Sequence, residues 1–583
     1  MSSKRSRIGH MTNTIDAGDG SAVDRLCRGE VSVLRMLSGV RGKATTVLAA
    51  ACAAVVCAGA VSVGGVVGIG GAVGAGIAAA ESTLDSTLDS TPARLSTSAD
   101  GQARIVDDQG RTVVLRGVNV NGLGEYYQEF PDLDSTIPLT EADFAGIAAK
   151  GFNVVRLIMT WSRIEPQRGV FDQAYLDEIA EAVNWAKKHD IGVILDMHQD
   201  AWGPAVNTPD GTVCPSFMKP AVGWDGAPAW ATAVTDPVMT CRLEDSREVS
   251  VAVQTSFEDF YNDLNGIQGE FVKSWEFVVR RFATEPAVVG YDLLNEPNPG
   301  LAVGFNDYVR LGQMYDRLVP AIRAAEASVP GGFSHTVYFE PGVVSSILPT
   351  PGPATGSADS SGSAGSTGSA SSGPSGFTSD SNLVYAPHIY NESLPLAIGT
   401  IEQGFANAQK AADNYGTPFF SGEWGFFGKP ADDAPKLARY AAAEDSYRIG
   451  GTWWQWKQAC GDPHNIQVRG ERPDCQAGEF GGLAGFPAED PLLPILTRAY
   501  PRAVPGELTD IRADVPSGAL EVEGVADRAG VSADLWVPQR CGSPEVSGTN
   551  VGTAAVRSVD GGYRVSVLVT AVGVYQVDVV CAG

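Results

Sequence analysis

Residues 288–297 read Val-Val-Gly-Tyr-Asp-Leu-Leu-Asn-Glu-Pro, a short β-rich run that ends in a glutamate followed by a proline. Similar runs recur along the chain, and helical patterns separate them. They are Val113–Val120, Val154–Ile158, Gly192–Met197, Val288–Leu294, Thr336–Glu340, Leu383–Ile389, Pro418–Gly422 and Gly450–Trp456. Strands that alternate with helices in this way predict an α/β fold, a parallel sheet closed into a (β/α)8 TIM barrel. A doubly wound open sheet is the alternative, but no glycine fingerprint follows the first strand.

The helical segments between the strands carry their own signals. Thr140 and Asp143 have the spacing of a capping box, which opens a helix. Asp172 precedes a helix whose apolar residues recur at helical spacing, namely Leu176, Ile179, Ala180 and Val183. Residues 271–282 show the same period. The pattern predicts helices with one apolar face each.

After about residue 503 the pattern changes. Short strand patterns follow one another, separated by Gly, Pro and Ser turns, with no helical pattern among them. They are Leu520–Val525, Ala533–Val537, Tyr563–Leu568 and Tyr575–Cys581. The sequence therefore predicts a barrel domain over residues 101–503 and a small all-β sandwich over residues 504–583.

Two stretches have low complexity. Residues 81–100 contain Ser/Thr/Asp repeats without a core-forming pattern and are predicted to be a linker. Residues 349–381 are almost entirely Gly, Ser, Ala, Pro and Thr, which cannot bury enough apolar surface to offset the entropy of ordering. Because strand patterns of the barrel flank this second stretch, we predict a disordered insertion within the barrel domain.

The N-terminus predicts export. Residues 44–80 contain no Asp, Glu, Lys or Arg, and they follow Arg35, Arg41 and Lys43. A basic segment before an apolar run is typical of a signal peptide, and the alanines at 78–80 suit a cleavage site. The run is also long enough to span a bilayer, so a retained anchor is the alternative. Residues 1–80 are thus predicted to be a signal or anchor segment, and the protein to be secreted or anchored to the outer face of the membrane.

Cysteine usage agrees with export. Three cysteines lie before residue 80, and six follow it in near-sequence pairs. Those pairs are Cys214 with Cys241, Cys460 with Cys475, and Cys541 with Cys581. An even number of cysteines outside the cytoplasm indicates disulfides, although six cysteines formally allow 15 connectivities.

Charge and motifs exclude several classes of protein. The chain of 583 residues has a net charge of −26, and residues 81–583 carry 34 basic and 64 acidic side chains. Such an acidic chain is unsuited to duplex nucleic acid, whose phosphates require a basic face. No HExxH, GxxxxGK[ST] or CxxC motif is present, so we expect no metal and no cofactor. We expect a monomer.

Two strand ends carry glutamates. A TIM barrel places its active site where the C-terminal ends of the strands meet their loops. The fourth strand runs into Asn295-Glu296-Pro297, and the seventh runs into Glu423-Trp424. Cleavage of a glycosidic bond requires such a pair, one carboxylic acid to protonate the departing oxygen and one carboxylate to attack the anomeric carbon.

Other strand ends supply groups that suit this chemistry. Arg156, on the second strand, could keep one carboxylate ionised, and His388 or Tyr390, after the sixth, could orient the nucleophile. The sugar-binding candidates are His198 and Asp200 after the third strand, for hydroxyl groups, and Trp454 and Trp456 on the eighth, for stacking on a pyranose ring. Each is weak evidence by itself, but together they favour a glycosidase.

This constellation resembles glycoside hydrolase family 5, a family of retaining enzymes. The resemblance covers roughly residues 100–500 and implies that Glu296 is the acid/base and Glu423 the nucleophile. It also implies that Asn295 bonds the 2-hydroxyl of the sugar and that a tryptophan of the eighth strand is the platform for the ring, for which we favour Trp456 and keep Trp454 as the alternative. For the acid role we expect a raised pKa of Glu296, caused by the nearby charge of Glu423.

The sequence resembles the endoglycoceramidases in particular, which release intact glycans from ceramide. The resemblance rests on His198-Gln199-Asp200, Gly226-Ala227-Pro228-Ala229-Trp230-Ala231 and residues 290–297. It implies a C-terminal β-sandwich and an Asp200 that binds the glucose next to the lipid. Members of that group carry a lysine soon after the first strand, whereas residues 119–129 here (NVNGLGEYYQE) contain none. A glucosidase acting on glucosylceramide or another glucolipid is therefore an alternative.

The long loop after the third strand is the second sign of a lipid substrate. Residues 201–257 contain several large apolar residues, Trp202, Phe217, Met218, Trp224, Trp230 and Met239. They could form a wall for a lipid aglycone, with Trp230 contacting substrate, or they could simply pack the loop onto the barrel. We therefore expect a glycolipid substrate and contact with a membrane surface. The alternatives are a β-glucanase or β-mannanase of the same fold, and a non-catalytic carbohydrate- or lipid-binding protein.

Overall fold

The structure is a computed structural model that describes residues 93–98, 102–243, 246–346, 377–394, 397–466 and 469–581. The predicted signal or anchor segment (residues 1–80) lies outside the described residues, as does most of the predicted insertion, residues 347–376. No helix among the described residues is both long and apolar enough to cross a membrane.

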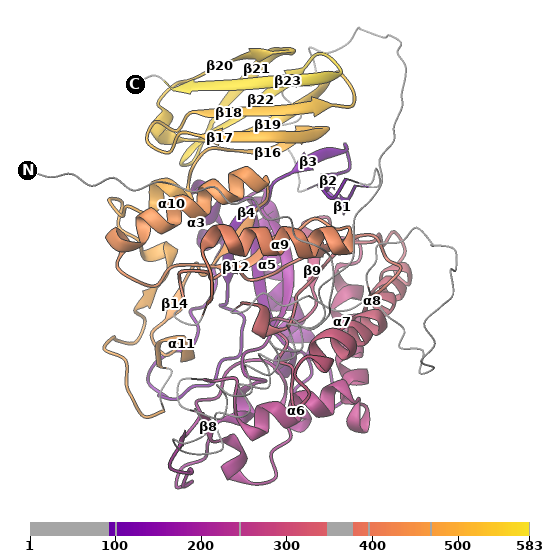
Figure 1. Cartoon of the computed structure of the whole chain (residues 1–583), viewed down its shortest axis with the longest axis vertical. Helices are drawn as coiled ribbons and strands as arrows, with labels where there is room; N and C mark the ends of the chain where they lie inside the picture. The colour runs from indigo at the N-terminus through magenta and orange to yellow at the C-terminus, as the bar shows by residue number, and fades with distance from the viewer. Residues whose placement is uncertain are drawn as a thin grey trace, which may run out of the picture. The chain divides into compact units, whose positions relative to one another are not determined.

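The strands of the barrel form a single parallel sheet (Figure 1). In chain order they are β4 (Arg116–Val120), β5 (Val154–Thr160), β6 (Gly192–His198), β9 (Val288–Asp292), β10 (Thr336–Phe339), β11 (Leu383–Tyr385), β12 (Ser421–Trp424) and β13 (Gly451–Trp453). The sheet closes where Tyr385 pairs with Phe419 in a parallel bridge, next to β12. All the predicted barrel strands are present, and the predicted TIM barrel is confirmed.

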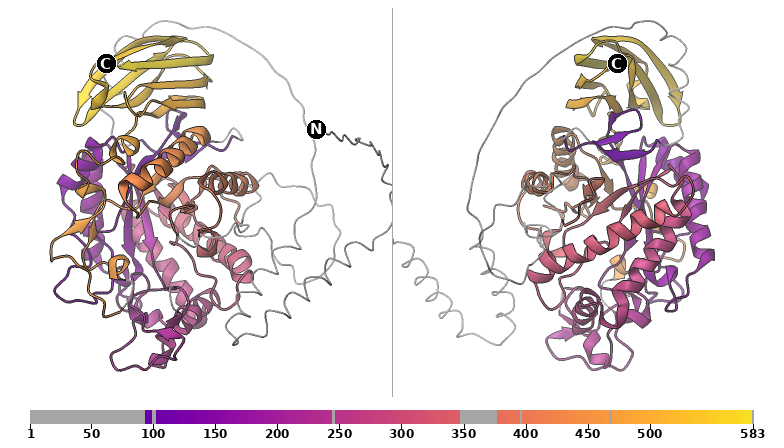
Figure 2. Two further views of the ribbon diagram at one scale, coloured as in Figure 1. Left: turned by 60° about the vertical axis from the view of Figure 1, so that its left-hand side comes forward. Right: turned by 90° about the vertical axis from the view of Figure 1, so that its right-hand side faces the viewer.

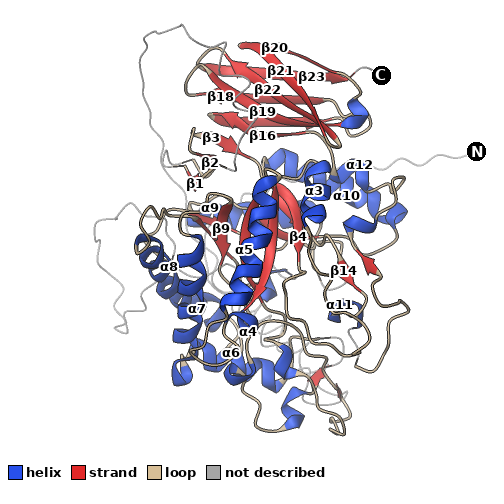
Figure 3. Ribbon diagram, turned by 180° about the vertical axis from the view of Figure 1, so that it is seen from behind, coloured by secondary structure: helices blue, strands red, loops and turns tan. Residues whose placement is uncertain are grey.

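Helices alternate with these strands and lie outside them (Figures 2 and 3). The longer ones are α3 (Glu141–Ala149), α5 (Gln173–Lys188), α6 (Val251–Tyr261), α7 (Ile267–Phe282), α8 (Leu311–Ala327), α9 (Ile401–Tyr415) and α10 (Pro430–Tyr447). Short helical turns are α4 (Trp161–Ile164), α11 (Pro463–Ile466) and α12 (Leu493–Leu496). Asp172 caps α5 by accepting hydrogen bonds from two backbone N–H groups of its first turn, and the predicted apolar face of α5 is buried against the strands. At α3, Thr140 and Asp143 form the predicted capping box.

The C-terminal region consists of two antiparallel sheets that enclose a second apolar core. One sheet has four strands, in the order β17 (Glu507–Ala513), β18 (Leu520–Ala526), β23 (Gly573–Cys581) and β20 (Pro544–Thr549). The other contains β16 (Tyr500–Pro505), β19 (Val531–Pro538), β22 (Gly562–Val569) and β21 (Val551–Val559). It is extended beyond β16 by β3 (Arg111–Val113), β2 (Ile105–Asp107) and β1 (Leu95–Thr97).

The structure differs from the predicted domain boundaries at both low-complexity stretches. Residues 95–97, which we assigned to the linker, form an edge strand of the sandwich sheet, where Leu95 is buried. Strands β2 and β3, assigned to the barrel domain, belong to the same sheet. At the end of the predicted insertion, Phe377 packs edge-on against Phe339 and Asp380 pairs with Arg323. These residues therefore belong to the folded barrel.

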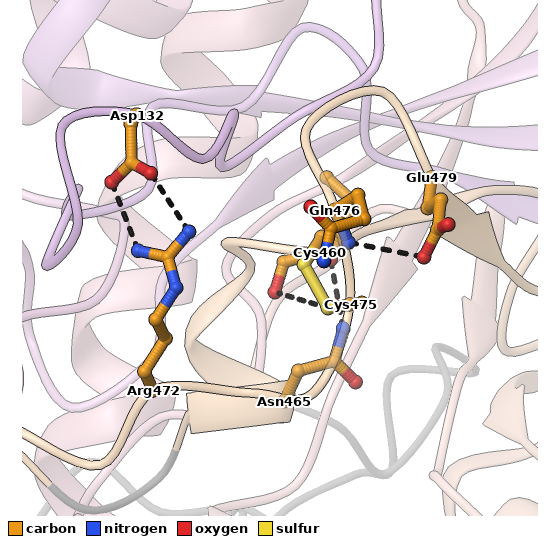
Figure 4. Close-up of a disulfide and its surroundings, with 8 residues drawn as sticks. Asp132, Cys460, Asn465, Arg472, Cys475, Gln476 and Glu479 are labelled. Atoms are coloured by element: carbon orange, nitrogen blue, oxygen red, sulfur yellow. Dashed lines mark hydrogen bonds and ion pairs between the residues drawn. A yellow bond between two sulfur atoms is a disulfide. The ribbon is translucent and has the colours of Figure 1, made fainter.

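All three predicted disulfides are present and confirm the near-sequence pairing. Figure 4 shows Cys460–Cys475, which closes a loop after the eighth strand of the barrel. Arg472, at the tip of this loop, donates two hydrogen bonds to Asp132 at 2.9 and 2.7 Å, and the backbone N–H of Gln476 donates one to Glu479 at 3.0 Å. The disulfide and the ion pair together hold the loop to the segment that follows the first strand.

The sandwich contacts the barrel at the N-terminal ends of the barrel strands. The hydroxyl of Tyr500 donates to the carbonyl of Gly151 at 2.8 Å, just before β5, and Arg564 pairs with Asp190 at 2.6 Å, just before β6. Gly151 has a φ of +87° and faces the Trp536 indole. Because TIM-barrel active sites lie at the opposite ends of the strands, the sandwich leaves that end open.

Gly151→Ala is therefore expected to lower the free energy of unfolding by about 2–4 kcal/mol. A left-handed backbone disfavours alanine by about 1 kcal/mol, and a methyl group here would clash with Trp536, which adds the effect of overpacking, about 1–3 kcal/mol. The matched control is Gly169→Ala, because Gly169 has a φ of +76° but open space around it. Urea unfolding would measure both variants, and equal losses would contradict the proposed contact between the two domains.

Candidate active site

The inside of the barrel changes from apolar to charged along the strands. Near the N-terminal ends, Val154, Ile194 and Tyr338 belong to one buried apolar cluster. Side chains on a strand return to the same face every second residue. Two positions further along, the same face therefore carries an arginine, an aspartate and a glutamate, namely Arg156, Asp196 and Glu340.

Arg156 is the centre of this charged layer. Its guanidinium is fully buried and forms ion pairs with four carboxylates, those of Asp292 (2.8 Å), Asp196 (2.9 Å), Glu340 (2.9 Å) and Glu423 (2.8 Å). A buried charge is tolerated only when it is paired, and here a single cation is shared among several anions. We expected Arg156 to pair with one carboxylate, and in the structure it pairs with four.

The two predicted glutamates lie together at the mouth of the barrel. Nδ1 of His388 lies 2.8 Å from Oε1 of Glu296 and 3.5 Å from Oε2 of Glu423. One oxygen of each glutamate and a ring nitrogen of His388 lie within 4.8 Å of one another. Retaining glycosidases hold their two carboxyl groups about 5–5.5 Å apart, so the spacing suits direct attack on a sugar carbon.

Glu423 is held from two sides at the end of β12. Arg156 donates to Oε1 at 2.8 Å, and the hydroxyl of Tyr390 donates to Oε2 at 3.0 Å. Both carboxylate oxygens of Glu423 are therefore held in position, and Tyr390 lies at the site as predicted.

Glu296 follows β9 in an unusual backbone conformation, with a φ of +38°. Its backbone N–H donates to Oε2 of Glu340 at 2.7 Å. The neighbouring Asn295 is fixed as well, because its Oδ1 accepts from Arg156 at 2.9 Å and its amide donates to the carbonyl of Gln199 at 3.0 Å. The contacts around Asn295 and Glu296 thus support a conformation that non-glycine residues rarely adopt.

The pKa of Glu296 differs from the expectation. Burial raises it, but the hydrogen bond from His388 and the positive charges of His388 and Arg247 outweigh burial and lower the pKa to about 2. We had expected the charge of Glu423 to raise it. The physical reason is that His388 and Arg247 lie beside Glu296, and the sequence did not predict two cations there.

His198 and Asp200 lie on the other side of the site, after β6. Nδ1 of His198 is 2.6 Å from Asp196, and burial lowers the pKa of His198 well below its usual value, so the ring is neutral. Asp200 pairs with Arg247 at 2.5 Å, and its Oδ2 lies 3.4 Å from the ring of His464. Burial raises the pKa of Asp200 to about 7, against the charges of Arg247 and His464.

The two candidate tryptophans are separated. Trp454 stacks on His198 with ring centroids 5.6 Å apart, so this tryptophan faces the site. Trp456, which we favoured as the platform, instead donates from its indole N–H to Asp143 of α3 at 3.0 Å and lies against Gly146. Strand β13 ends at Trp453, so the alternation on which we placed both rings on one face does not extend to Trp456.

Trp230 is also absent from the group around the two glutamates. Its indole N–H donates to the carbonyl of Glu165 at 3.0 Å, and its ring lies edge-on to Trp161 at 5.3 Å. Trp202 is buried edge-on against Phe257, whereas Phe217 is exposed. The loop after β6 therefore packs mainly onto the barrel, which was the second of our two interpretations.

Several site residues were missed by the sequence reasoning. Glu340, Asp196 and Asp292 sit at or near strand ends, so the reasoning that identified Glu296 could have found them. Arg247 lies in a loop, where it stacks over Trp224 at 4.3 Å, and His464 lies in the short turn α11, and neither segment has a periodic signal. Loop residues of this kind can be placed only by the tertiary structure.

Three groups of side chains within the described residues have the spacing of metal ligands. They are Glu296, His388 and Glu423; Asp196, Asp292 and Glu340; and His198, Asp200 and Asp225. Arg156 already provides the cation for the second group. In the first group, the hydrogen-bond contact between His388 and Glu296 joins two of the ligands directly.

A closed barrel with two glutamates facing each other across its C-terminal mouth defines a glycoside hydrolase. Residues 106–460 match the sequence model of Cellulase (glycosyl hydrolase family 5), so the chain belongs to glycosyl hydrolase family 5. This confirms the family predicted from the strand-end motifs.

Similarity to individual proteins shows which members of the family this chain resembles. It is 28% identical to endoglycoceramidase I of Rhodococcus hoagii (strain 103S) over 312 residues, 52% of this chain and 54% of that protein. The chain spans about half the length of the curated relatives that it matches first. A crystal structure of endogalactoceramidase is 40% identical and has a TM-score of 0.70, covering 83% of this chain and 99% of that one.

Endo-glycoceramidase II from Rhodococcus sp., solved as a lactosyl-enzyme intermediate, is 25% identical with a TM-score of 0.57 and covers 82% of this chain and 99% of that one. These similarities confirm the resemblance to endoglycoceramidases that the sequence motifs indicated.

Proposed function

We propose that this chain is a retaining endo-β-glycosidase that hydrolyses the bond between a glycan and ceramide. The observation that carries the proposal is the pair Glu296 and Glu423, whose oxygens approach the same nitrogen of His388 and lie within 4.8 Å. The lactosyl-enzyme intermediate of endo-glycoceramidase II and the similarity to endoglycoceramidase I support it.

The reaction proceeds in two displacements. In the first, Oε2 or Oε1 of Glu423 attacks the anomeric carbon, the bond to the ceramide oxygen breaks, and Glu296 gives its proton to that oxygen. In the second, Glu296 removes a proton from water as the water oxygen displaces Glu423, which releases the free glycan. Arg156 and Tyr390 orient Glu423, while Trp454, stacked on His198, offers an aromatic surface to the sugar.

An apolar rim on one side of the mouth supports a lipid aglycone. Exposed apolar residues occur in the loops after the fourth, sixth and seventh barrel strands, each between 36% and 63% exposed. They are Leu301, Val303 and Phe305, then Leu394 and Ile398, and finally Phe427. Loops that follow parallel strands lie at the same end of a barrel, and clustered apolar residues on a surface mark contact with a lipid or partner. We propose that this rim contacts ceramide and the membrane surface that contains it.

The double variant Leu301→Ser/Val303→Ser is expected to raise KM for glycolipid in vesicles about tenfold. Each side chain contributes part of the 1.5–3 kcal/mol that full burial of an aliphatic side chain provides, and 1.4 kcal/mol is a factor of ten. Hydrolysis of a soluble aryl glycoside should be unchanged. Val572→Ser, an equally exposed valine in the sandwich, is the matched control. A similar KM for all three proteins on vesicles would contradict the proposed role of the rim.

Product analysis tests the cleaved bond. The purified protein would be incubated with a panel of glycosphingolipids, and both products identified by mass spectrometry. Free oligosaccharide together with ceramide is the expected result. Release of glucose alone would indicate a simple glucosidase, and preferential hydrolysis of carboxymethyl-cellulose or mannan would indicate a polysaccharide hydrolase.

A second candidate differs in the sugar that is joined to ceramide. The 40% identity to endogalactoceramidase favours galactose over the glucose that we first expected. The absence of lysine from residues 119–129 is a further departure from the endoglycoceramidase pattern. Two glycolipids that differ only in the sugar bonded to ceramide, glucose or galactose, would be compared. The substrate with the higher kcat/KM identifies the preferred sugar.

We also propose that the protein acts outside the cytoplasm as a monomer. The three disulfides support export, because such bonds persist in oxidising compartments. The monomeric state is tested by measuring the molecular mass of the protein in solution. Fractionation of cells that express the full chain, followed by mass determination of the N-terminus, would show whether residues 1–80 are removed or retained.

A further inference from the structure

Glu340 touches every part of the proposed acid/base apparatus, although no motif in the sequence drew attention to it. Its carboxylate follows β10 and is buried. Oε2 accepts the backbone N–H of Glu296 at 2.7 Å, while Oε1 lies 2.9 Å from Arg156 and 3.2 Å from Nε2 of His388. One side chain thus contacts the backbone of Glu296 and the imidazole that bonds its carboxylate.

His388 connects Glu340 with Glu296 through its two ring nitrogens. Nδ1 lies 2.8 Å from Oε1 of Glu296, and Nε2 lies 3.2 Å from Oε1 of Glu340. Within the described residues Nε2 is buried without a hydrogen bond of good geometry, and Oε1 of Glu340 is the carboxylate oxygen that approaches it, at 3.2 Å. The second nitrogen of a histidine decides which tautomer and orientation the ring adopts, so Glu340 controls the proton that His388 presents to Glu296.

We propose that Glu340 and His388 form a proton relay that supplies Glu296 and takes its proton back in each catalytic cycle. This inference rests on the proposed function, because it concerns how Glu296 acts as acid and base. It adds Glu340 as a positioning residue, which acts on the reacting atoms only through His388 and Glu296.

The relay conserves protons. In the first displacement, the carboxyl proton of Glu340 passes to Nε2 of His388, the Nδ1 proton passes to Oε1 of Glu296, and Glu296 protonates the departing ceramide oxygen. His388 keeps one N–H throughout, and Glu340 becomes a carboxylate beside Arg156. In the second displacement, the proton that Glu296 takes from water returns through Nδ1 and Nε2 to Glu340.

The charges around the relay agree with transfer of the proton from Glu340 through His388 to Glu296. Burial raises the pKa of Glu340 to about 8, against the charges of His388 and Arg156, whereas the pKa of Glu296 is lowered to about 2. The proton therefore rests between Glu340 and His388 rather than on Glu296. The negative charges of Glu340, Glu423 and Glu296 raise the pKa of His388 well above its usual value despite burial, which lets the ring accept a proton. The remaining charged group facing Glu340 is Asp292, whose charge also raises the pKa of Glu340.

Glu340→Gln tests the relay when two leaving groups are compared. Glutamine cannot pass a proton along the relay, so kcat/KM for a glycosphingolipid is expected to fall about 100-fold, the lower end of what general acid catalysis contributes. A 2,4-dinitrophenyl glycoside of the same glycan has a leaving group that needs no proton, so its kcat/KM should change by less than about threefold. Glu340→Asp keeps a carboxyl group and should recover part of the activity on glycolipid.

The pH profile provides a second readout. In the wild type, kcat/KM for glycolipid should fall above about pH 8, as Glu340 loses its proton. In Glu340→Gln the proton must come from His388, whose pKa falls because one of its three neighbouring carboxylates is gone. The basic limb should therefore move to lower pH.

Asp292→Asn is the matched control. Asp292 is buried and pairs with Arg156 at 2.8 Å, as Glu340 does, but the structure shows no contact of Asp292 with His388 or Glu296 within the described residues. Any loss in Asp292→Asn should be equal for both leaving groups, although the basic limb should move to lower pH because the charge of Asp292 raises the pKa of Glu340. Equal losses for both leaving groups in Glu340→Gln would overturn the relay and leave Glu340 with a purely structural role. Failure of the wild type on both substrates would instead overturn the proposed function.

Discussion

Replacing Glu423 by glutamine is expected to lower kcat/KM more than about 10⁴-fold on every substrate, because no other described side chain is placed to attack the anomeric carbon. The fold should survive. Glutamine has nearly the same shape, its oxygen can accept from Arg156, and its amide can donate to the hydroxyl of Tyr390. Unlike a lost acid, a lost nucleophile cannot be compensated by a better leaving group, so the dinitrophenyl glycoside should be affected as strongly as the glycolipid.

Mass spectrometry of the intact protein and its peptides provides the direct measurement. A 2-fluoro glycoside with a good leaving group should form a stable adduct on the peptide that contains Glu423, and Glu423→Gln should form none. Glu402→Gln, an exposed glutamate on α9 that pairs with Arg439, controls for the loss of one negative charge. Retention of more than a few per cent of activity in Glu423→Gln would contradict the assignment of the nucleophile. A trapped adduct would exclude a non-catalytic binding protein.

The barrel and its pair of glutamates could be predicted because both follow from local patterns. Each strand is a short run that begins and ends within its own segment, and parallel strands bring their C-terminal ends to one mouth. Glu296 and Glu423 therefore converge whatever the loops do. Topology alone brings the two glutamates together, so no knowledge of side-chain contacts is needed to predict the pair.

The tryptophans show where the same reasoning stops. Trp454 and Trp456 are two residues apart, and period-two alternation places both on one face only while the strand continues. Strand β13 ends before either of them, and Trp456 turns to Asp143 on α3. Strands β1 to β3 were assigned to the wrong domain for a related reason. They join the sandwich sheet only through β3, whose partner β16 lies almost 400 residues away in the chain, and such pairing leaves no local signal.

The pKa of Glu296 could not have been predicted from the pair alone. Proximity to Glu423 suggested a raised pKa, but the sign depends on His388 and Arg247, which approach from other strands and loops. The charge balance of the site is a property of the whole cluster around Arg156 and His388. It can be tested by removing the central cation.

Arg156→Met is expected to lower the free energy of unfolding by about 3–5 kcal/mol at pH 7 and to abolish activity. Methionine fills similar space but leaves four buried carboxylates without their cation, and an uncompensated buried charge destabilises a protein by about that much. Activity should be lost because Glu423 loses the hydrogen bond from Arg156 that orients its carboxylate for attack.

The stability that Arg156→Met loses should increase with pH, because of the carboxyl groups around Arg156. Burial raises the pKa of Asp292 to about 6, of Asp196 to about 7 and of Glu340 to about 8, although Arg156 opposes each shift. These values lie above those of the unfolded chain, so the folded protein holds more protons, and its stability falls as pH rises from about 4 to 8. Without Arg156 the three pKa values rise further, and the slope becomes steeper and extends to higher pH.

Urea unfolding at pH 5 and pH 8 measures this difference directly. Arg156→Met should lose more stability relative to the wild type at pH 8 than at pH 5, because at pH 5 the carboxylates are already protonated and need no cation. Arg280→Met is the matched control, since Arg280 pairs with Glu276 on the exposed face of α7 and should contribute less than about 1 kcal/mol at either pH. An equal loss at both pH values would mean that Arg156 acts through packing, and that the carboxylates around it are not held by its charge.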